Sequence, residues 1–257
     1  MRTRLMEEMT WKEVEEAIQD GAGVLLPIGA TEQHGYHLPV STDVVLPKKM
    51  GLSIAEETNL IVAPPIAYGF RSRPGSGGGQ TFPATTSLRG TTLIALITDI
   101  LREFVRGGFR KIVLLNWHME NSGFVYEAAF LVCEEMQEKY PDLKILVFES
   151  AFDTLKPESM EKIFEGQFPT WAIEHASIFE TSLMMYTAPE LVQFDKAVND
   201  RAEDYPYYDV LPIQPKYVPR SGTLWKARMA SREKGELAWK EVHEMLVEHI
   251  NKEFGFS

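Results

Sequence analysis

Short apolar runs alternate with longer amphipathic segments along this chain, and no other feature constrains its fold as strongly. The apolar runs predict buried strands, at residues 24–28, 60–64, 111–115 and 144–148. The longer segments have the length and periodicity of helices, at residues 10–20, 44–57, 91–106, 122–139 and 231–252. This order is typical of right-handed βαβ units, so we expect an α/β fold with a mainly parallel sheet covered by helices on both faces.

The bulk composition is that of one ordinary globular domain. The 257 residues contain no stretch that resembles a linker, so we expect a single domain over residues 1–257. The formal net charge of −11 repels phosphate backbones and anionic bilayers, which argues against nucleic acid and membranes as partners. The acidic N-terminal stretch lacks the apolar core of a signal peptide, and we therefore expect a cytoplasmic location. The single cysteine, Cys133, excludes an intrachain disulfide and a thiolate-rich metal site.

Imidazole and carboxylate side chains follow two of the predicted strands. Glu32 and His34 come after the first apolar run, and Asp43 precedes the next helix as its N-cap or as a ligand. His118 and Glu120 come after the third run, where a spacing of two directs both to the same side of an extended segment. The carboxyl ends of parallel strands meet at one edge of a sheet, so we expect these five side chains to form one site.

The residue types of this set indicate which metals it would hold. Two imidazoles and three carboxylates suit Zn, Mn or a mixed pair, and they argue against copper and Fe–S centres. We expect Asp43 to bridge two metals about 3.5 Å apart, which would convert a water between them into a nucleophile near neutral pH. His37 breaks the two-residue spacing and is interpreted as a supporting or loop residue. His243 and His249 lie in the charged C-terminal helix and are predicted to be surface residues.

Two further segments carry polar groups. The long loop at residues 65–87 lacks periodicity, which is typical of a functional loop. Its core, residues 76–83, predicts either a nest of backbone N–H groups that binds an anion or oxyanion, or a flexible surface hairpin. Glu174, His175 and Glu180 fall near the start of a helical pattern, which suits groups directed into a cavity.

Residues 189–221 show no clear period, and we expect them to wrap around the body or a neighbouring subunit.

Several motifs together resemble those of the creatininase (creatinine amidohydrolase) family. The most specific is PIGATEQHG at residues 27–35. The others lie at residues 76–79, 82–83, 85–88, 118, 120–122, 173–175, 179–182 and 230–236. The resemblance runs from near the N-terminus to the last helix. It implies a binuclear metal hydrolase with a three-layer α/β/α sandwich, assembled as a homohexamer from a trimer of dimers.

The resemblance also assigns roles to the metal-binding candidates. Carried over position by position, it implies that Glu32, Asp43 and His118 bind one metal ion. It implies that His34, Asp43 and Glu120 bind the other, and Glu120 is expected to be essential for catalysis. The expected cofactors are therefore two divalent metal ions, Zn and/or Mn.

The implied substrate pocket departs from the creatinine-cleaving members of the family. Ser76, Trp171 and His175 fall where the family contacts its substrate, and His175 is implied as the proton shuttle. Met119 stands where those enzymes have a substrate-contacting Tyr, and Ala172 replaces an Asp. The metal ligands are intact, so the resemblance implies an altered pocket wall around a preserved metal centre.

Two more departures concern aromatic positions. Trp117 replaces a Gly that precedes the metal-binding His, and the lid Trp expected after the fourth strand is absent near residues 150–152. We expect hydrolysis of a small cyclic amide by a metal-bridged hydroxide, with creatinine to creatine as the favoured reaction. Two alternatives stay open. One is a hydrolase of this family that acts on a formamide-type amide or a cyclic ketone, and the other is a non-catalytic assembly protein with structural metals.

Overall fold

A four-stranded parallel sheet forms the centre of the molecule. The computed structural model describes residues 2–73, 75–149, 152–200 and 208–256. Within these residues the strand order is β2-β1-β3-β4, and every neighbouring pair is parallel. The strands are β1 (Gly23–Ile28), β2 (Leu60–Val62), β3 (Lys111–Asn116) and β4 (Lys144–Phe148). Since the register pairs Ile28 with Asn116, the segments that follow β1 and β3 start side by side.

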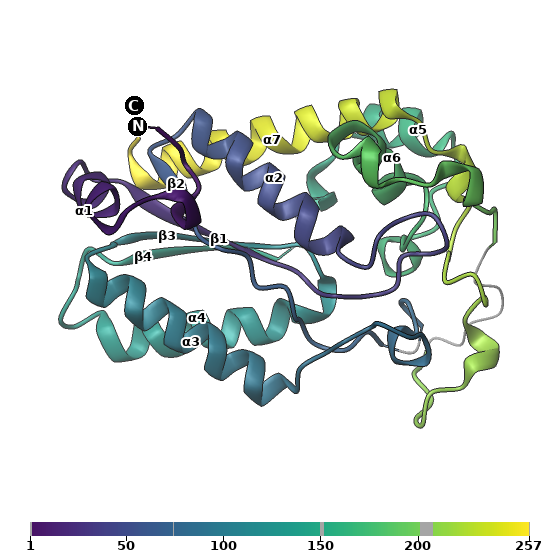
Figure 1. The fold of residues 1–257 in the computed structure, drawn as a ribbon, viewed down its shortest axis with the longest axis horizontal. Coiled ribbons are helices and arrows are strands. Elements are labelled where there is room, and N and C mark those ends of the chain that lie inside the picture. The colour runs from purple at the N-terminus through teal and green to yellow at the C-terminus, as the bar shows by residue number, and fades with distance from the viewer. Residues whose placement is uncertain (1, 74, 150–151, 201–207, 257) are drawn as a thin grey trace.

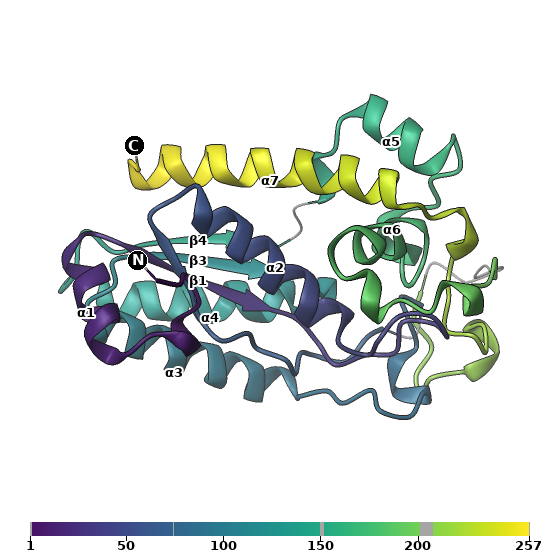
Figure 2. The ribbon, with the colours of Figure 1, turned by 45° about the horizontal axis from the view of Figure 1, so that its top comes forward.

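Helices cover both faces of this sheet, which confirms the three-layer α/β/α architecture (Figure 1). One face packs against α1 (Trp11–Gln19), α3 (Gly90–Gly107) and α4 (Ser122–Met136). The core on the other face includes α2 (Thr42–Glu56) and α7 (Arg232–Phe254), and it continues past the strands to α5 (Pro157–Phe164) and α6 (Ile178–Thr187). Figure 2 shows that α6 lies beyond one end of the sheet, so the molecule extends past the strands there.

The strands are apolar throughout because both of their faces are buried. In β1, Val24, Leu26 and Ile28 pack into the core against α3 and α4, whereas Leu25 packs into the opposite core. The same alternation holds in β3, because successive side chains of a strand point to opposite faces. The uninterrupted apolar runs in the sequence are therefore explained by burial on two sides.

A close backbone contact joins the end of β1 to the start of α2. A Cβ atom on Gly29 would overlap the carbonyl oxygen of Asp43 and lie 2.6 Å from its carbonyl carbon. The helix starts two residues earlier than predicted, so Asp43 lies in its first turn and Ser41 is the N-cap residue. Gly29 thus allows the carboxylate of Asp43 to lie beside the residues that follow β1.

Two local predictions were wrong for identifiable reasons. Residues Met119–Asn121 form a 3-10 turn rather than a continuation of the extended strand. The Asn121 side chain favours this turn, since its amide donates to the carbonyl of Gly29 (3.0 Å) and accepts from the N–H of Phe70 (2.7 Å). His243 is only 9% exposed, because α7 packs against α2 there and Nε2 of His243 lies 3.8 Å from Oε1 of Glu57, directly after α2. His249, in contrast, is exposed as predicted.

None of the helices that the structure describes combines the length and apolar composition needed to cross a bilayer.

Candidate metal centre and substrate cavity

A cavity of about 500 Å³ opens where the segments after β1 and β3 meet α6. Every site residue that we predicted from the sequence, except His34, lines it. These lining residues are Glu32, Asp43, Ser76, His118, Met119, Glu120, Trp171, Ala172 and His175. The parallel sheet therefore brings polar groups from distant parts of the chain to one edge.

The first cluster of metal-ligand atoms comes from Glu32, Asp43 and His118. The Nδ1 atom of His118 lies 3.2 Å from Oε2 of Glu32 and 3.3 Å from Oδ2 of Asp43. All three side chains are buried, and their ligand atoms lie within 4.8 Å of one another. The other oxygen of Glu32 accepts a hydrogen bond from the hydroxyl of Ser72. The structure thus brings together the set expected for one metal ion.

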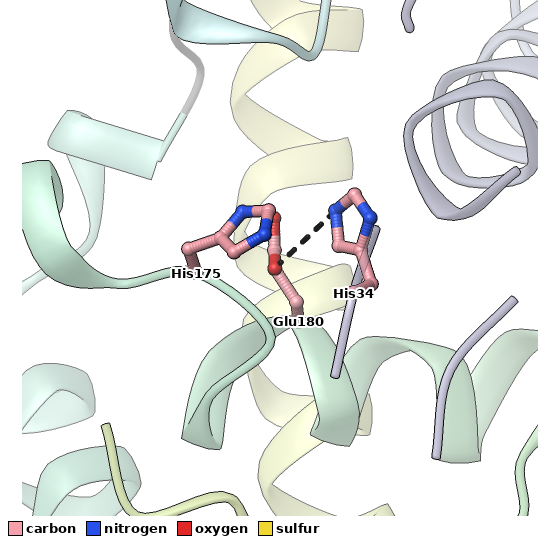
Figure 3. Close-up of side chains that lie close together, drawn as sticks. All are labelled: His34, His175 and Glu180. Atoms are coloured by element: carbon pink, nitrogen blue, oxygen red, sulfur yellow. Dashed lines mark ion pairs between the residues drawn. The ribbon is translucent and has the colours of Figure 1, made fainter. Parts of the chain in front are cut away.

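A second cluster adjoins the first through Asp43. Here the Nε2 atom of His34 lies 3.0 Å from Oδ1 of Asp43 and 3.7 Å from Oε2 of Glu180. Figure 3 shows that His175 lies beside His34 and Glu180. These three side chains offer ligand atoms within 4.8 Å of one another. Asp43 directs one oxygen to each of two histidines, which is the arrangement that a bridging carboxylate needs.

Backbone carbonyl groups fix which ring nitrogen of each histidine could bind a metal ion. Nε2 of His118 lies 3.0 Å from the carbonyl oxygen of Phe70, and Nδ1 of His34 lies 3.1 Å from that of Glu32. A carbonyl can only accept, so these nitrogens carry the protons and donate. The nitrogens that face the carboxylates, Nδ1 of His118 and Nε2 of His34, are therefore the ones that would offer a lone pair to a metal ion that displaces their protons.

The electrostatics of the site also fit bound cations. Burial raises the pKa of Glu32 and Asp43, but the neighbouring imidazoles outweigh it and lower both pKa values below their ordinary range. Burial likewise opposes the charged forms of His34 and His118, but the carboxylates raise both pKa values well above normal. Among the described residues, Glu32 and Asp43 pair only with histidines. Divalent ions would take over this role from the imidazole protons.

Glu120 lies on the far side of His118 from the other carboxylates. Its Oε1 atom accepts from the hydroxyl of Ser76, and its Oε2 atom lies 3.6 Å from Nε2 of His118. The structure brings Glu180, rather than Glu120, next to His34. The assignment of Glu120 to the second metal ion stays a prediction, and Glu180 is a further candidate.

The sequence predicted that Glu180 is directed into a cavity, and the structure confirms this. Its position beside His34 was not predicted, because it depends on an irregular turn. Ala176 adopts a left-handed conformation (φ +51°), and its N–H donates to Oε2 of Glu180 at 2.6 Å. This turn lies between His175 and the first turn of α6, and the side chains of His175 and Glu180 both line the cavity. Glu174, which precedes His175, is also buried. Its burial, and to a smaller extent the charge of Glu180, raise the pKa of Glu174 to about 8. The helical pattern predicted that these groups face a cavity, but no local periodicity signals the contact between Glu180 and His34.

The glycine-rich loop packs against the site. Gly77, Gly78 and Gly79 are buried, which excludes a flexible surface hairpin. The N–H groups of Ser76 and Gly78 donate to the carbonyl of Arg73 (3.2 and 3.4 Å), so the prediction of an anion-binding nest was wrong for these two groups. The loop instead contributes the Ser76 hydroxyl that contacts Glu120.

Aromatic rings form the apolar part of the cavity wall. Phe152 packs edge-on against Trp117 (ring centroids 4.7 Å apart), and it also contacts Trp171 (5.9 Å). Residues 150 and 151, where we looked for a lid Trp, lie outside the described residues. Met119 is 45% exposed in the cavity wall, so its side chain is accessible to a ligand.

The parallel α/β fold and the carboxylate-bridged histidine clusters define a metal-dependent hydrolase. A family model described as "Creatininase: Creatinine amidohydrolase" matches residues 7–250, and the chain belongs to the creatininase family. The chain is 42% identical over 250 residues to a creatinine amidohydrolase of Pseudomonas putida, covering 96% of each protein. It is 26% identical over 264 residues to a 3-dehydro-scyllo-inosose hydrolase of Thermotoga maritima, covering 95% of this chain and 80% of that enzyme.

Solved structures agree with this assignment. A Glu-to-Gln mutant creatininase complexed with creatine superposes with a TM-score of 0.93 at 39% identity, covering 98% of this chain and 99% of the other. A Zn–Zn type of that mutant has a TM-score of 0.95 at 39% identity and covers 99% of both chains. A Mn creatininase has a TM-score of 0.94 at 40% identity, covering 98% and 99%. These matches confirm the predicted family and fold.

Proposed function

We propose that this protein is a metal-dependent amidohydrolase that opens a small cyclic amide, with creatinine to creatine as its favoured reaction. The observation that carries this proposal is Asp43, whose two oxygens face His34 and His118 at one edge of the cavity. The 42% identity to a creatinine amidohydrolase supports the choice of substrate. The direct test is an assay of creatinine hydrolysis by Zn-loaded or Mn-loaded protein beside formamides and cyclic ketones, and turnover of these but not creatinine would contradict the choice.

The residues present fit two divalent ions, Zn and/or Mn. Glu32, Asp43 and His118 would hold one ion, and His34 with Asp43 would hold the other together with Glu120 or Glu180. When bound, such ions polarise a carbonyl group and lower the pKa of a coordinated water. Metal-bound relatives of the Zn–Zn and Mn types support this choice of metals.

His175 is the proposed proton carrier of the reaction. Ring opening breaks the carbon–nitrogen bond of the amide, and the departing nitrogen must gain a proton. His175 lines the cavity and, unlike His34 and His118, forms no ion pair with a carboxylate among the described residues. Trp117, Phe152 and Trp171 form an apolar wall of the cavity, which would exclude water from a bound substrate.

Replacing Met119 with Tyr should increase creatinine turnover. Met119 lines the cavity, and its side chain offers no strong hydrogen-bonding group to a polar ring. A tyrosine hydroxyl that bonds the substrate is expected to raise kcat/KM about 3- to 10-fold, which corresponds to one net hydrogen bond. Steady-state kinetics would measure this, with Met119→Phe as the control that adds the ring without the hydroxyl. An equal gain in both variants would show that ring size, and not the hydroxyl, limits the reaction.

The composition of the pocket wall also supports the alternative substrates. Ala172 and Met119 leave the cavity without the polar side chains expected of creatinine-cleaving members. The similarity to a hydrolase named for 3-dehydro-scyllo-inosose favours a cyclic ketone as the second candidate substrate. A non-catalytic assembly protein is not supported, because metals that only brace a fold sit in closed ligand shells, whereas this cluster lines a cavity of about 500 Å³.

Further proposals concern the whole chain. We propose a single domain over residues 1–257, a homohexamer built as a trimer of dimers, and a cytoplasmic location. The family resemblance supports the hexamer, and the net charge of −11 favours a small molecule over nucleic acid or a membrane as the partner. Light scattering that gives the mass of one chain, 29.2 kDa, would contradict the hexamer.

A further inference from the structure

Gln33 lies between two metal-binding candidates, and no role has yet been assigned to it. Its side chain is buried, with 6% of the residue exposed. It hydrogen-bonds to three segments that are far apart in the sequence: the turn at Gly35, the loop at Gly77 and the loop at Gly222. Its backbone carbonyl contacts a fourth segment through His175. Gln33 is therefore a junction of the loops that surround the site.

The backbone partners fix the orientation of the Gln33 amide. Its Nε2 atom donates to the carbonyl oxygens of Gly77 (3.1 Å) and Gly222 (3.0 Å). Its Oε1 atom accepts from the N–H of Gly35 at 3.0 Å. Carbonyls only accept and a backbone N–H only donates, so the reversed amide would oppose all three partners. Both amide protons are consequently used.

This orientation determines the tautomer of His175. The Nε2 atom of His175 lies 2.9 Å from Nε2 of Gln33 and 2.8 Å from the carbonyl oxygen of the same residue. Because both amide protons already point to Gly77 and Gly222, the imidazole must supply the proton of its own hydrogen bond. Nε2 of His175 therefore donates to the Gln33 carbonyl, and the lone pair of the neutral ring resides on Nδ1.

Gly222 is shaped to receive the Gln33 amide. Its backbone has φ +77°, a conformation that favours glycine, and a Cβ atom there would overlap Oε1 of Gln33. The loop that follows is tied to His175 as well, since the N–H of Leu224 donates to the His175 carbonyl at 3.1 Å. The loop at Gly222 thus contacts both partners of the Gln33–His175 pair.

We propose that Gln33 is a positioning residue of the reaction. Its amide holds the loops at Gly77 and Gly222 over the site, and together with its own carbonyl it fixes His175 as the Nε2–H tautomer. The functional part of this proposal rests on His175 as the proton carrier. The geometric part, a single tautomer and two anchored loops, does not depend on which substrate the enzyme opens.

The test compares Gln33→Glu with Gln19→Glu, the same chemical change at an exposed position of α1. A carboxylate at position 33 would oppose the carbonyls of Gly77 and Gly222 and would pair with His175. We expect kcat for creatinine to fall about 30-fold, the loss of two hydrogen bonds, with a smaller change in KM. Gln19→Glu should change neither. A Gln33→Glu enzyme with unchanged kcat would overturn the proposal.

A spectroscopic measurement keeps the proposal testable if Gln33→Glu does not fold or if creatinine is not the substrate. Solid-state ¹⁵N spectra of Zn-loaded protein with labelled histidine would report the protonation of each ring nitrogen, and comparison with His175→Gln would assign the signals. We expect His175 of the unaltered protein to be protonated at Nε2 alone. A proton on Nδ1 alone would overturn the positioning role, whatever substrate the enzyme hydrolyses. The expected tautomer without creatinine turnover would overturn only the proposed reaction.

Discussion

Replacing His118 with Ala should abolish turnover and release metal from the protein. Nδ1 of His118 lies between Glu32 and Asp43, so its loss leaves Glu32 without its imidazole partner and Asp43 with His34 alone. One metal ion would also lose its nitrogen ligand. Metal ions supply several kcal/mol of transition-state stabilisation, and we expect kcat/KM to fall about 1,000-fold or more. Steady-state kinetics and elemental analysis of the purified variant would measure both effects.

Three variants complete this experiment. His249→Ala alters an exposed histidine of α7 and should leave activity and metal content unchanged. Glu120→Gln should also abolish turnover, and its metal content should fall if Glu120 is a ligand of the second ion. Comparison with Glu180→Gln would show which carboxylate accompanies His34. A purified His118→Ala protein with full activity would refute the metal centre.

Replacing Gly29 with Ala should strongly destabilise the fold. The added Cβ would overlap the backbone carbonyl of Asp43, which cannot move away without separating β1 from the first turn of α2. We expect the free energy of unfolding to fall by about 1–3 kcal/mol, as in other overpacked cores. The displacement would also move Asp43, so metal affinity should decline along with stability.

Gly107 provides the matched control for this substitution. It is the last residue of α3, and a Cβ atom there would have no atom within 4 Å apart from the neighbouring backbone of its own helix. Gly107→Ala should therefore leave stability unchanged or raise it by up to about 1 kcal/mol. Urea unfolding of the two variants would measure the difference, and equal stabilities would show that the contact between Gly29 and Asp43 does not constrain the fold.

The sheet and much of the site could be predicted because their signals are local. Four apolar runs marked the strands, and the polar residues directly after β1 and β3 marked the edge where ligands collect. Parallel pairing of β1 with β3 then brings Glu32 and His118 together without further information. The family motifs supplied what this pattern lacks, namely the contribution of Ser76, Trp171 and His175 from other segments.

The features that were not predicted depend on tertiary contacts, which the periodicity of the sequence does not indicate. The contact of Glu180 with His34 depends on the left-handed turn at Ala176, whose N–H donates to Glu180. The 3-10 turn that carries Glu120 follows from the hydrogen bonds of the Asn121 side chain to Gly29 and Phe70. The buried position of His243 follows from packing of α7 against α2, although the sequence of α7 is highly charged.

The role of Gln33 illustrates the same limit. In the sequence it is one polar residue within a family motif, and neither its spacing nor its type indicates a partner. Only the fold shows that its amide meets carbonyl groups 44 and 189 residues away.

Removal of metal tests the central claim most directly, because two cations held by the clusters around Asp43 are the proposed source of the reaction. The measurement is the rate of ring opening by protein that has been exhaustively chelated, and then again after Zn or Mn is restored. The structure predicts that the rate falls to background and returns with about two metal ions bound per chain. Undiminished turnover by protein shown to be free of metal would contradict it.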